Sequence, residues 1–112
     1  MNAEMLKGHL DNVILATLER GPAHGYAVIE DIRQRSGGRF DLPEGTVYPA
    51  LHRLEIAGLL VSDWVTPDAG RRKRVYTLTP VGRDALKDRR AGWAEFSRAV
   101  GAFMEPEKPC AA

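Results

Sequence analysis

The chain has 112 residues, enough for one domain with a hydrophobic core but not for two. Apolar residues make up 44% and charged residues 28%, which is typical of a soluble globular protein, and no apolar run is long enough for a signal peptide or a membrane span. Cys110 is the single cysteine, so an intrachain disulfide is excluded and we expect a cytoplasmic protein. Because the apolar runs are short, we expect no membrane partner.

Two short helices are predicted in the first 40 residues. Apolar residues recur at helical spacing over residues 4–20, and Gly21-Pro22 ends this helix. A second helix is predicted from Tyr26 to Ser36. Gly37-Gly38 ends it, because glycine readily adopts the left-handed conformation that closes a helix.

The third predicted helix spans residues 44–57 and has one apolar face. The apolar positions recur at i, i+3, i+4 and i+7, and are Val47, Ala50, Leu51 and Leu54. The side chains that point elsewhere are Thr46, Tyr48, Pro49, His52 and Arg53. Pro49 is tolerable because the first turns of a helix lack backbone partners, and Gly58 ends the helix.

Two strands and a long helix are predicted to follow. Residues 59–66 and 74–78 are rich in β-branched and aromatic residues, and a turn at residues 67–70 joins them. Thr79 is suited to cap the last helix, which begins at Pro80 and runs to Met104. We expect residues 105–112 to form a disordered tail.

The positive charge of the chain is concentrated in one stretch. Residues 71–90 carry eight Lys and Arg against two Asp, a net charge of +6, although the whole chain carries only +1. This concentration is typical of a local contact with a polyanion such as nucleic acid. The alternative is a solvated surface segment whose charges repel one another.

The last predicted helix has an apolar seam with the a/d spacing of a coiled coil. Leu86, Trp93 and Val100 are seven residues apart, and Phe96 and Phe103 lie three residues beyond the last two. At ~1.5 Å per residue the helix is roughly 35 Å long and projects beyond so small a domain. A second copy of the chain is therefore expected to cover the seam.

Three helices followed by a hairpin predict a winged helix-turn-helix. The fold class is mainly α with a small β-hairpin, with a DNA-binding domain at residues 1–79 and a dimerisation helix at residues 80–104. In this fold the third helix enters the major groove of double-stranded DNA. The predicted contacts are Thr46, Tyr48, Pro49, His52 and Arg53 on that helix and Arg71, Arg72, Lys73 and Arg74 on the hairpin.

Alternatives remain open for several of these side chains. The Tyr48 ring can be half buried with only its hydroxyl at the surface, and Arg53 can form a local pair with an acid on the same helix surface. Because strand residues alternate between faces, the four hairpin cations cannot all contact DNA. We favour Arg72 and Arg74 as one set, without knowing which face they share.

The sequence lacks the patterns of common catalytic and metal sites. His9, His24 and His52 are too widely spaced for a zinc site, and one cysteine cannot complete it. Neither a nucleophile elbow nor a phosphate-binding loop occurs. We therefore expect no enzyme activity and no cofactor. A winged-helix domain that binds only proteins is a further alternative, but such modules usually lack a concentrated basic hairpin.

Five motifs occur in order between roughly residues 8 and 90. They are His24-Gly25-Tyr26, Gly45-Thr-Val-Tyr-Pro-Ala-Leu-His-Arg-Leu-Glu55, Gly58-Leu59, Arg74-Val-Tyr-Thr-Leu-Thr79 and Gly82-Arg-x-x-Leu86. Together they resemble the PadR family of bacterial transcription regulators. The single helix that follows is similar to the branch of this family with a short C-terminal part.

The resemblance implies a homodimer that binds an inverted-repeat operator, usually as a repressor. It implies that the last helix is the main dimer element, formed here through Leu86, Trp93, Phe96, Val100 and Phe103. It also implies release from DNA on binding a small hydrophobic or aromatic effector, which in some members lies beside a tryptophan of the last helix. Trp93 stands at that position, with Phe96 nearby. The alternative is that both are ordinary dimer-core residues.

Overall fold

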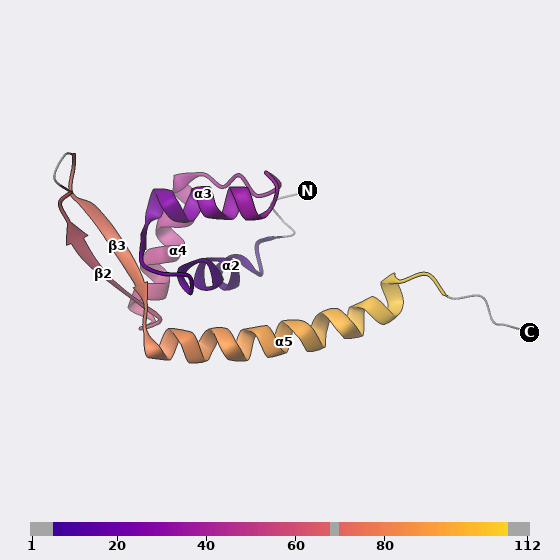
Figure 1. Cartoon of the computed structure of the whole chain (residues 1–112). Helices are drawn as coiled ribbons and strands as arrows, with labels where there is room; N and C mark the ends of the chain where they lie inside the picture. The colour runs from indigo at the N-terminus through magenta and orange to yellow at the C-terminus, as the bar shows by residue number, and fades with distance from the viewer. Residues whose placement is uncertain (1–5, 68–69, 108–112) are drawn as a thin grey trace, which may run out of the picture.

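A computed structural model describes residues 6–67 and 70–107 of the chain. Its elements in order are α2 (Leu10–Leu18), β1 (Ala23–His24), α3 (Gly25–Arg35), α4 (Glu44–Ile56), β2 (Leu60–Val65), β3 (Lys73–Leu78) and α5 (Pro80–Met104). Figure 1 shows α2, α3 and α4 as a compact bundle, the β2–β3 hairpin at one side and the long α5 below. The predicted fold class, mainly α with a small β-hairpin in a winged helix-turn-helix, is confirmed.

The helix predicted over residues 4–20 is interrupted, because Leu6 is helical, residues 7–9 form a turn and the helix then resumes. We expected one helix over residues 4–20, but α2 begins at Leu10 and ends at Leu18. Residues 7–9 form a turn in which the His9 N–H donates to the Leu6 carbonyl at 2.7 Å, and the φ and ψ of His9, −124° and 1°, are not helical. Gly8 lies in this turn, where its conformational freedom favours a break in the helix. Residues 4 and 5 lie outside the described part.

The sheet has one strand that the sequence did not predict. The two-residue β1 pairs antiparallel with β3, placing Ala23 opposite Tyr76 and His24 opposite Val75. The strand order is therefore β1-β3-β2. Two residues are too few to show an alternating pattern, so only the pairing identifies this strand. It holds the start of α3 beside the hairpin.

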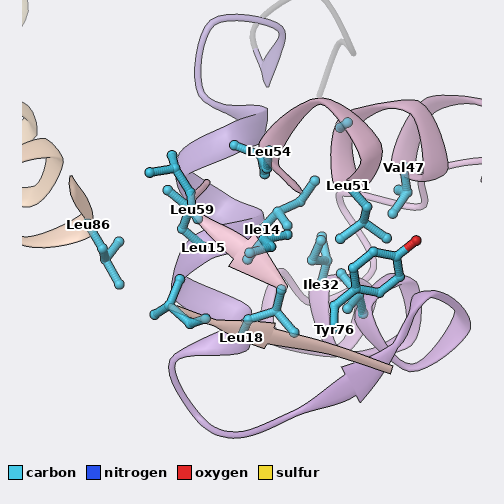
Figure 2. Packing of buried hydrophobic residues seen from close by; sticks show 14 of the residues in the cluster. Ile14, Leu15, Leu18, Ile32, Val47, Leu51, Leu54, Leu59, Tyr76 and Leu86 are labelled. Atoms are coloured by element: carbon cyan, nitrogen blue, oxygen red, sulfur yellow. The ribbon is translucent and has the colours of Figure 1, made fainter. Parts of the chain in front are cut away.

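One hydrophobic core joins the three bundle helices, the sheet and the start of α5 (Figure 2). The predicted apolar face of the third helix is confirmed, because all four of its residues are buried: Val47, Ala50, Leu51 and Leu54. Burying side chains of this kind stabilises the fold by about 1.5–3 kcal/mol for each large one. The exposed face of α4 is thereby fixed on the opposite side.

The junction between the hairpin and α5 is closed by Thr79, as predicted. Its hydroxyl accepts a hydrogen bond from the Gly82 N–H at 2.9 Å and donates one to the Gly58 carbonyl at 2.8 Å. Gly58 has a φ of +82°, the left-handed conformation expected of a residue that ends a helix. The end of α4 and the beginning of α5 are thus tied together.

Leu86 corrects the predicted dimer seam. We grouped it with the exposed apolar residues of the last helix, but it is 2% exposed and belongs to the core of its own subunit. The first turns of α5 pack on the bundle before the helix leaves it (Figure 1), so the same apolar stripe serves two different surfaces.

The predicted tail begins after Met104, and its residues 108–112 lie outside the described part, as do residues 68–69 of the predicted turn.

Candidate nucleic-acid interface

The five predicted contact residues of α4 share one exposed face. Thr46, Tyr48, Pro49, His52 and Arg53 are all exposed, whereas the positions between them are buried. This face presents hydroxyl, imidazole and guanidinium groups to solvent. All three can hydrogen-bond to phosphates or to base edges.

Arg53 is already paired within the subunit. Its Nη2 lies 2.8 Å from Oδ1 of Asp11 on α2, so the partner acid is on another helix and not on the same helix surface as the alternative supposed. The Arg53 side chain nevertheless remains 61% exposed. An ion pair this exposed contributes about 0–1 kcal/mol, so a DNA phosphate or guanine can compete for the guanidinium.

Tyr48 is both packed and accessible. Its ring covers Gly25, where an added Cβ would lie 2.7 Å from Tyr48 Cζ, so only glycine fits beneath the ring. The side chain is still 38% exposed. Burial, together with the nearby Glu44 carboxylate, raises the pKa of the Tyr48 hydroxyl. The hydroxyl therefore keeps its proton at neutral pH and can donate to a phosphate oxygen.

The motif residue His24 is structural. Its Nδ1 accepts a hydrogen bond from the Ala27 N–H at 3.3 Å and so caps the start of α3. Burial, and then the charge of Lys73, lowers the pKa of His24. The imidazole is neutral at neutral pH, which keeps Nδ1 available as an acceptor.

Residues 60–78, comprising β2, β3 and their turn, are called the wing from here on. Arg72 and Arg74 share a face of the wing, because both guanidinium groups lie over the ring of Trp64, at 4.6 and 5.4 Å from its centroid. On the same face Tyr76 and Leu78 are buried against the bundle. The set that the sequence favoured therefore faces the helices. Arg71 and Lys73 are also exposed.

Arg74 is held against α4. Its Nε donates to Ser62 Oγ at 2.7 Å, and its Nη2 lies 3.5 Å from Oε1 of Glu55 on α4. Ser62 Oγ in turn donates to the Glu55 carboxylate. These contacts fix the wing relative to the exposed face of α4.

A cleft of about 500 Å³ lies between the wing and the helices. It is lined by His24, Gly25, Tyr26, Tyr48, Trp64, Arg72, Lys73, Arg74 and Tyr76. Two of these, Tyr26 and Trp64, are each 55% exposed and were not among the predicted contacts. Strand alternation could have indicated Trp64, because it is opposite Arg74 in the register.

A second hollow, of about 380 Å³, lies between α2 and α5. Trp93 lines it and meets His9 edge to face, with ring centroids 5.1 Å apart. The ring of Phe96 lies next to that of Trp93, with ring centroids 6.4 Å apart. Further along α5, Val100 is 39% and Phe103 88% exposed, so within one subunit the seam beyond Leu86 is largely uncovered.

Residues 6–67 and 70–107, the part of the chain that the structure describes, contain neither a metal-binding cluster nor a membrane-spanning helix. In that part of the chain no three His, Cys, Asp or Glu side chains are grouped so that they could hold a metal ion. Over the same residues, none of the helices combines the length and apolar character needed to cross a bilayer.

The sequence matches the family described as the transcriptional regulator PadR-like family over residues 14–88. It is also 46% identical over 77 residues to Transcriptional regulator Rv3488 of Mycobacterium tuberculosis, covering 69% of this chain and 68% of that protein. The chain belongs to the PadR-like family. As members of this family are DNA-binding regulators of transcription, the prediction that the protein is not an enzyme is confirmed.

Solved structures of PadR-like proteins share this fold. A transcriptional regulator from Clostridium thermocellum superimposes with a TM-score of 0.84 at 26% identity, over 91% of this chain and 99% of that one. A PadR family regulator from Eggerthella lenta superimposes with a TM-score of 0.81 at 30% identity, over 94% of this chain and 89% of that one. Bacillus subtilis PadR, solved in complex with operator DNA, superimposes with a TM-score of 0.65 at 22% identity, over 91% of this chain and 50% of that one. At this identity the similarity shows the fold alone.

Proposed function

We propose that the protein acts in the cytoplasm as a homodimeric repressor that binds an inverted-repeat operator. The observation that carries the DNA contact is the cleft between the exposed face of α4 and the wing. A helix fits the major groove, which is about 12 Å wide. With α4 in the groove, the wing cations are placed to contact the flanking phosphates.

The homodimer is proposed from the exposed part of α5. One stripe continues along α5 past Leu86, and its own subunit leaves each of its residues between 39% and 88% exposed: Trp93, Phe96, Val100 and Phe103. A monomer with so much contiguous apolar surface is unfavourable in water. A second α5 packed on this stripe relates two wings by a twofold axis, which matches the symmetry of an inverted repeat.

A winged-helix module that binds only proteins is the second candidate function. The concentration of cations beside α4, the recognition helix in this proposal, favours DNA over protein as the partner. Contacts between these cations and DNA phosphates give binding that weakens steeply as the salt concentration rises. A titration of the upstream DNA of its own gene by gel shift, at several salt concentrations, separates the two. Absence of any salt-sensitive shift would contradict a DNA-binding role.

We expect Arg72→Ala combined with Arg74→Ala to weaken binding to operator and random DNA alike. If the two side chains contact two phosphates in each subunit, the slope of log affinity against log salt falls by about two for each half-site. Arg83→Ala with Lys87→Ala removes two exposed charges of the same basic stretch outside the cleft, and should leave the slope nearly unchanged. Equal slopes for both double variants would place the wing cations off the DNA.

A small hydrophobic or aromatic effector is proposed to act through Trp93 and Phe96. The support is the hollow between α2 and α5, which Trp93 lines and which is bounded by Arg89 and Arg90. A flat apolar ligand stacked on an indole gains about 0.5–1.5 kcal/mol beyond burial. Such a ligand controls DNA binding only by favouring one spacing of the two recognition helices over another.

A planar aromatic compound is expected to quench the fluorescence of Trp93 and to release operator DNA over the same concentration range. Trp64→Phe is the background for the measurement, since it removes the other tryptophan but keeps an aromatic ring on the wing. Trp93→Ala, checked to be dimeric, should lose the release of DNA. Normal release in that variant would make Trp93 a packing residue only.

A further inference from the structure

Trp64 is the most exposed aromatic side chain of the wing, and the DNA contacts proposed above do not use it. It lies on β2 opposite Arg74, is 55% exposed and lines the cleft next to α4. Residues that serve only the core are buried, as Leu60 is on the same face of β2. The indole is instead accompanied by two cations, Arg72 and Arg74.

The two cations over the ring of Trp64 are held differently. Arg74 is fixed by Ser62 and by Glu55 of α4. Arg72 precedes β3, and its guanidinium carbon lies 4.6 Å from the centre of the Trp64 ring. The ring therefore supplies a flat support for Arg72, and Arg74 ties that support to the recognition helix.

Stacking on a ring leaves the edge of a guanidinium free. The N–H groups of arginine lie in the plane of the group and can donate to two phosphate oxygens while its face rests on an indole. A long side chain that is already ordered loses less conformational entropy on binding. Arg72, whose guanidinium carbon already lies over the Trp64 ring, is thus prepared for a phosphate before DNA arrives.

We propose that Trp64 is a positioning residue for DNA binding, which holds Arg72 at the mouth of the cleft so that it clamps one backbone phosphate beside α4. This inference rests on the proposed function, because it names how one wing contact is made. It also extends the interface to a neutral residue whose loss changes no charge.

The test is a change in salt dependence without a change in charge. Trp64→Leu should weaken binding to upstream DNA by about three- to tenfold, as expected for loss of a cation–π contact. The salt slope should fall by about 0.9 for each half-site, because one phosphate contact is lost in each subunit. Val65→Ala alters a neighbouring residue, 46% exposed, whose side chain points to the other face of β2, and should change neither quantity.

A double-mutant cycle identifies the partner. If Trp64 acts through Arg72, Trp64→Leu should add little to the loss caused by Arg72→Ala. A further measurement leaves Trp64 unaltered and uses the Trp93→Phe protein, after sedimentation and gel shift have shown that it is dimeric and binds upstream DNA as the wild type does. Its Trp64 fluorescence should change when upstream DNA is added.

Three results would overturn the inference while leaving the proposed function intact. They are an unchanged salt slope in Trp64→Leu, additive losses in the cycle, and a Trp64 fluorescence that is insensitive to DNA. By contrast, a wild-type protein that binds none of its upstream DNA would contradict the proposed function itself.

Discussion

Phe96→Glu is expected to convert the protein to monomers and to weaken operator binding by at least about 100-fold, the gain that joining two half-site contacts provides. Phe96 is 58% exposed in the subunit and stands in the middle of the stripe formed with Trp93, Val100 and Phe103. Burial of each such side chain in a dimer is worth about 1.5–3 kcal/mol. A carboxylate placed there would have to be desolvated without a partner, at a large cost in free energy.

Sedimentation at micromolar concentration and a gel shift on the same samples test this expectation. Ala91→Glu is the matched control, because it introduces the same charge at an exposed position on a different face of α5. It should stay dimeric and bind normally. A dimeric Phe96→Glu protein, or a monomer that binds its operator unchanged, would contradict dimerisation through this stripe.

Gly82→Ala is expected to be among the most destabilising single-methyl changes in the chain. Gly82 is buried in the first turn of α5, and a Cβ there would collide with the Leu59 carbonyl oxygen and lie 2.8 Å from Leu78 Cδ1. Backbone cannot move aside as a side-chain end can, so the added methyl strains the junction that Thr79 closes. Overpacking of this kind costs about 1–3 kcal/mol.

Thermal unfolding at one fixed protein concentration measures the effect of Gly82→Ala. For a domain of this size each kcal/mol corresponds to about 4–8 °C in Tm. Gly92→Ala on the same helix has no atom within 4 Å of its new Cβ, and should instead gain up to about 1 kcal/mol of helix stability. Equal Tm values for the two variants would show that the α4–α5 junction can relax.

The sequence determined the features of the fold that depend on neighbouring residues. The apolar spacing in residues 44–57 predicted the buried face of α4, and Thr79-Pro80 predicted the start of α5. Both signals are local, because helix periodicity and capping involve residues only three or four positions apart. The ordered motifs were likewise enough to predict membership of the PadR family.

The surface that each of these residues occupies depends on contacts between segments that are distant in the sequence. Leu86 and Trp93 stand one heptad apart on the same stripe, but Leu86 is 2% exposed in the core of its own subunit, whereas Trp93 is 52% exposed beside His9. Periodicity along a helix predicts that a position is covered. It does not predict whether the subunit's own core or a second subunit covers it.

The positions of the charged and aromatic residues of the interface also depend on contacts between segments that are distant in the sequence. The Arg53–Asp11 pair joins residues 42 positions apart, and the two residues of β1 are a strand only because β3 lies beside them. Alternation predicted that Arg72 and Arg74 share a face, but not that the face is turned toward α4 with Trp64 beneath them. Contacts between distant segments depend on how the chain folds back on itself, and this is the information that a local pattern does not contain.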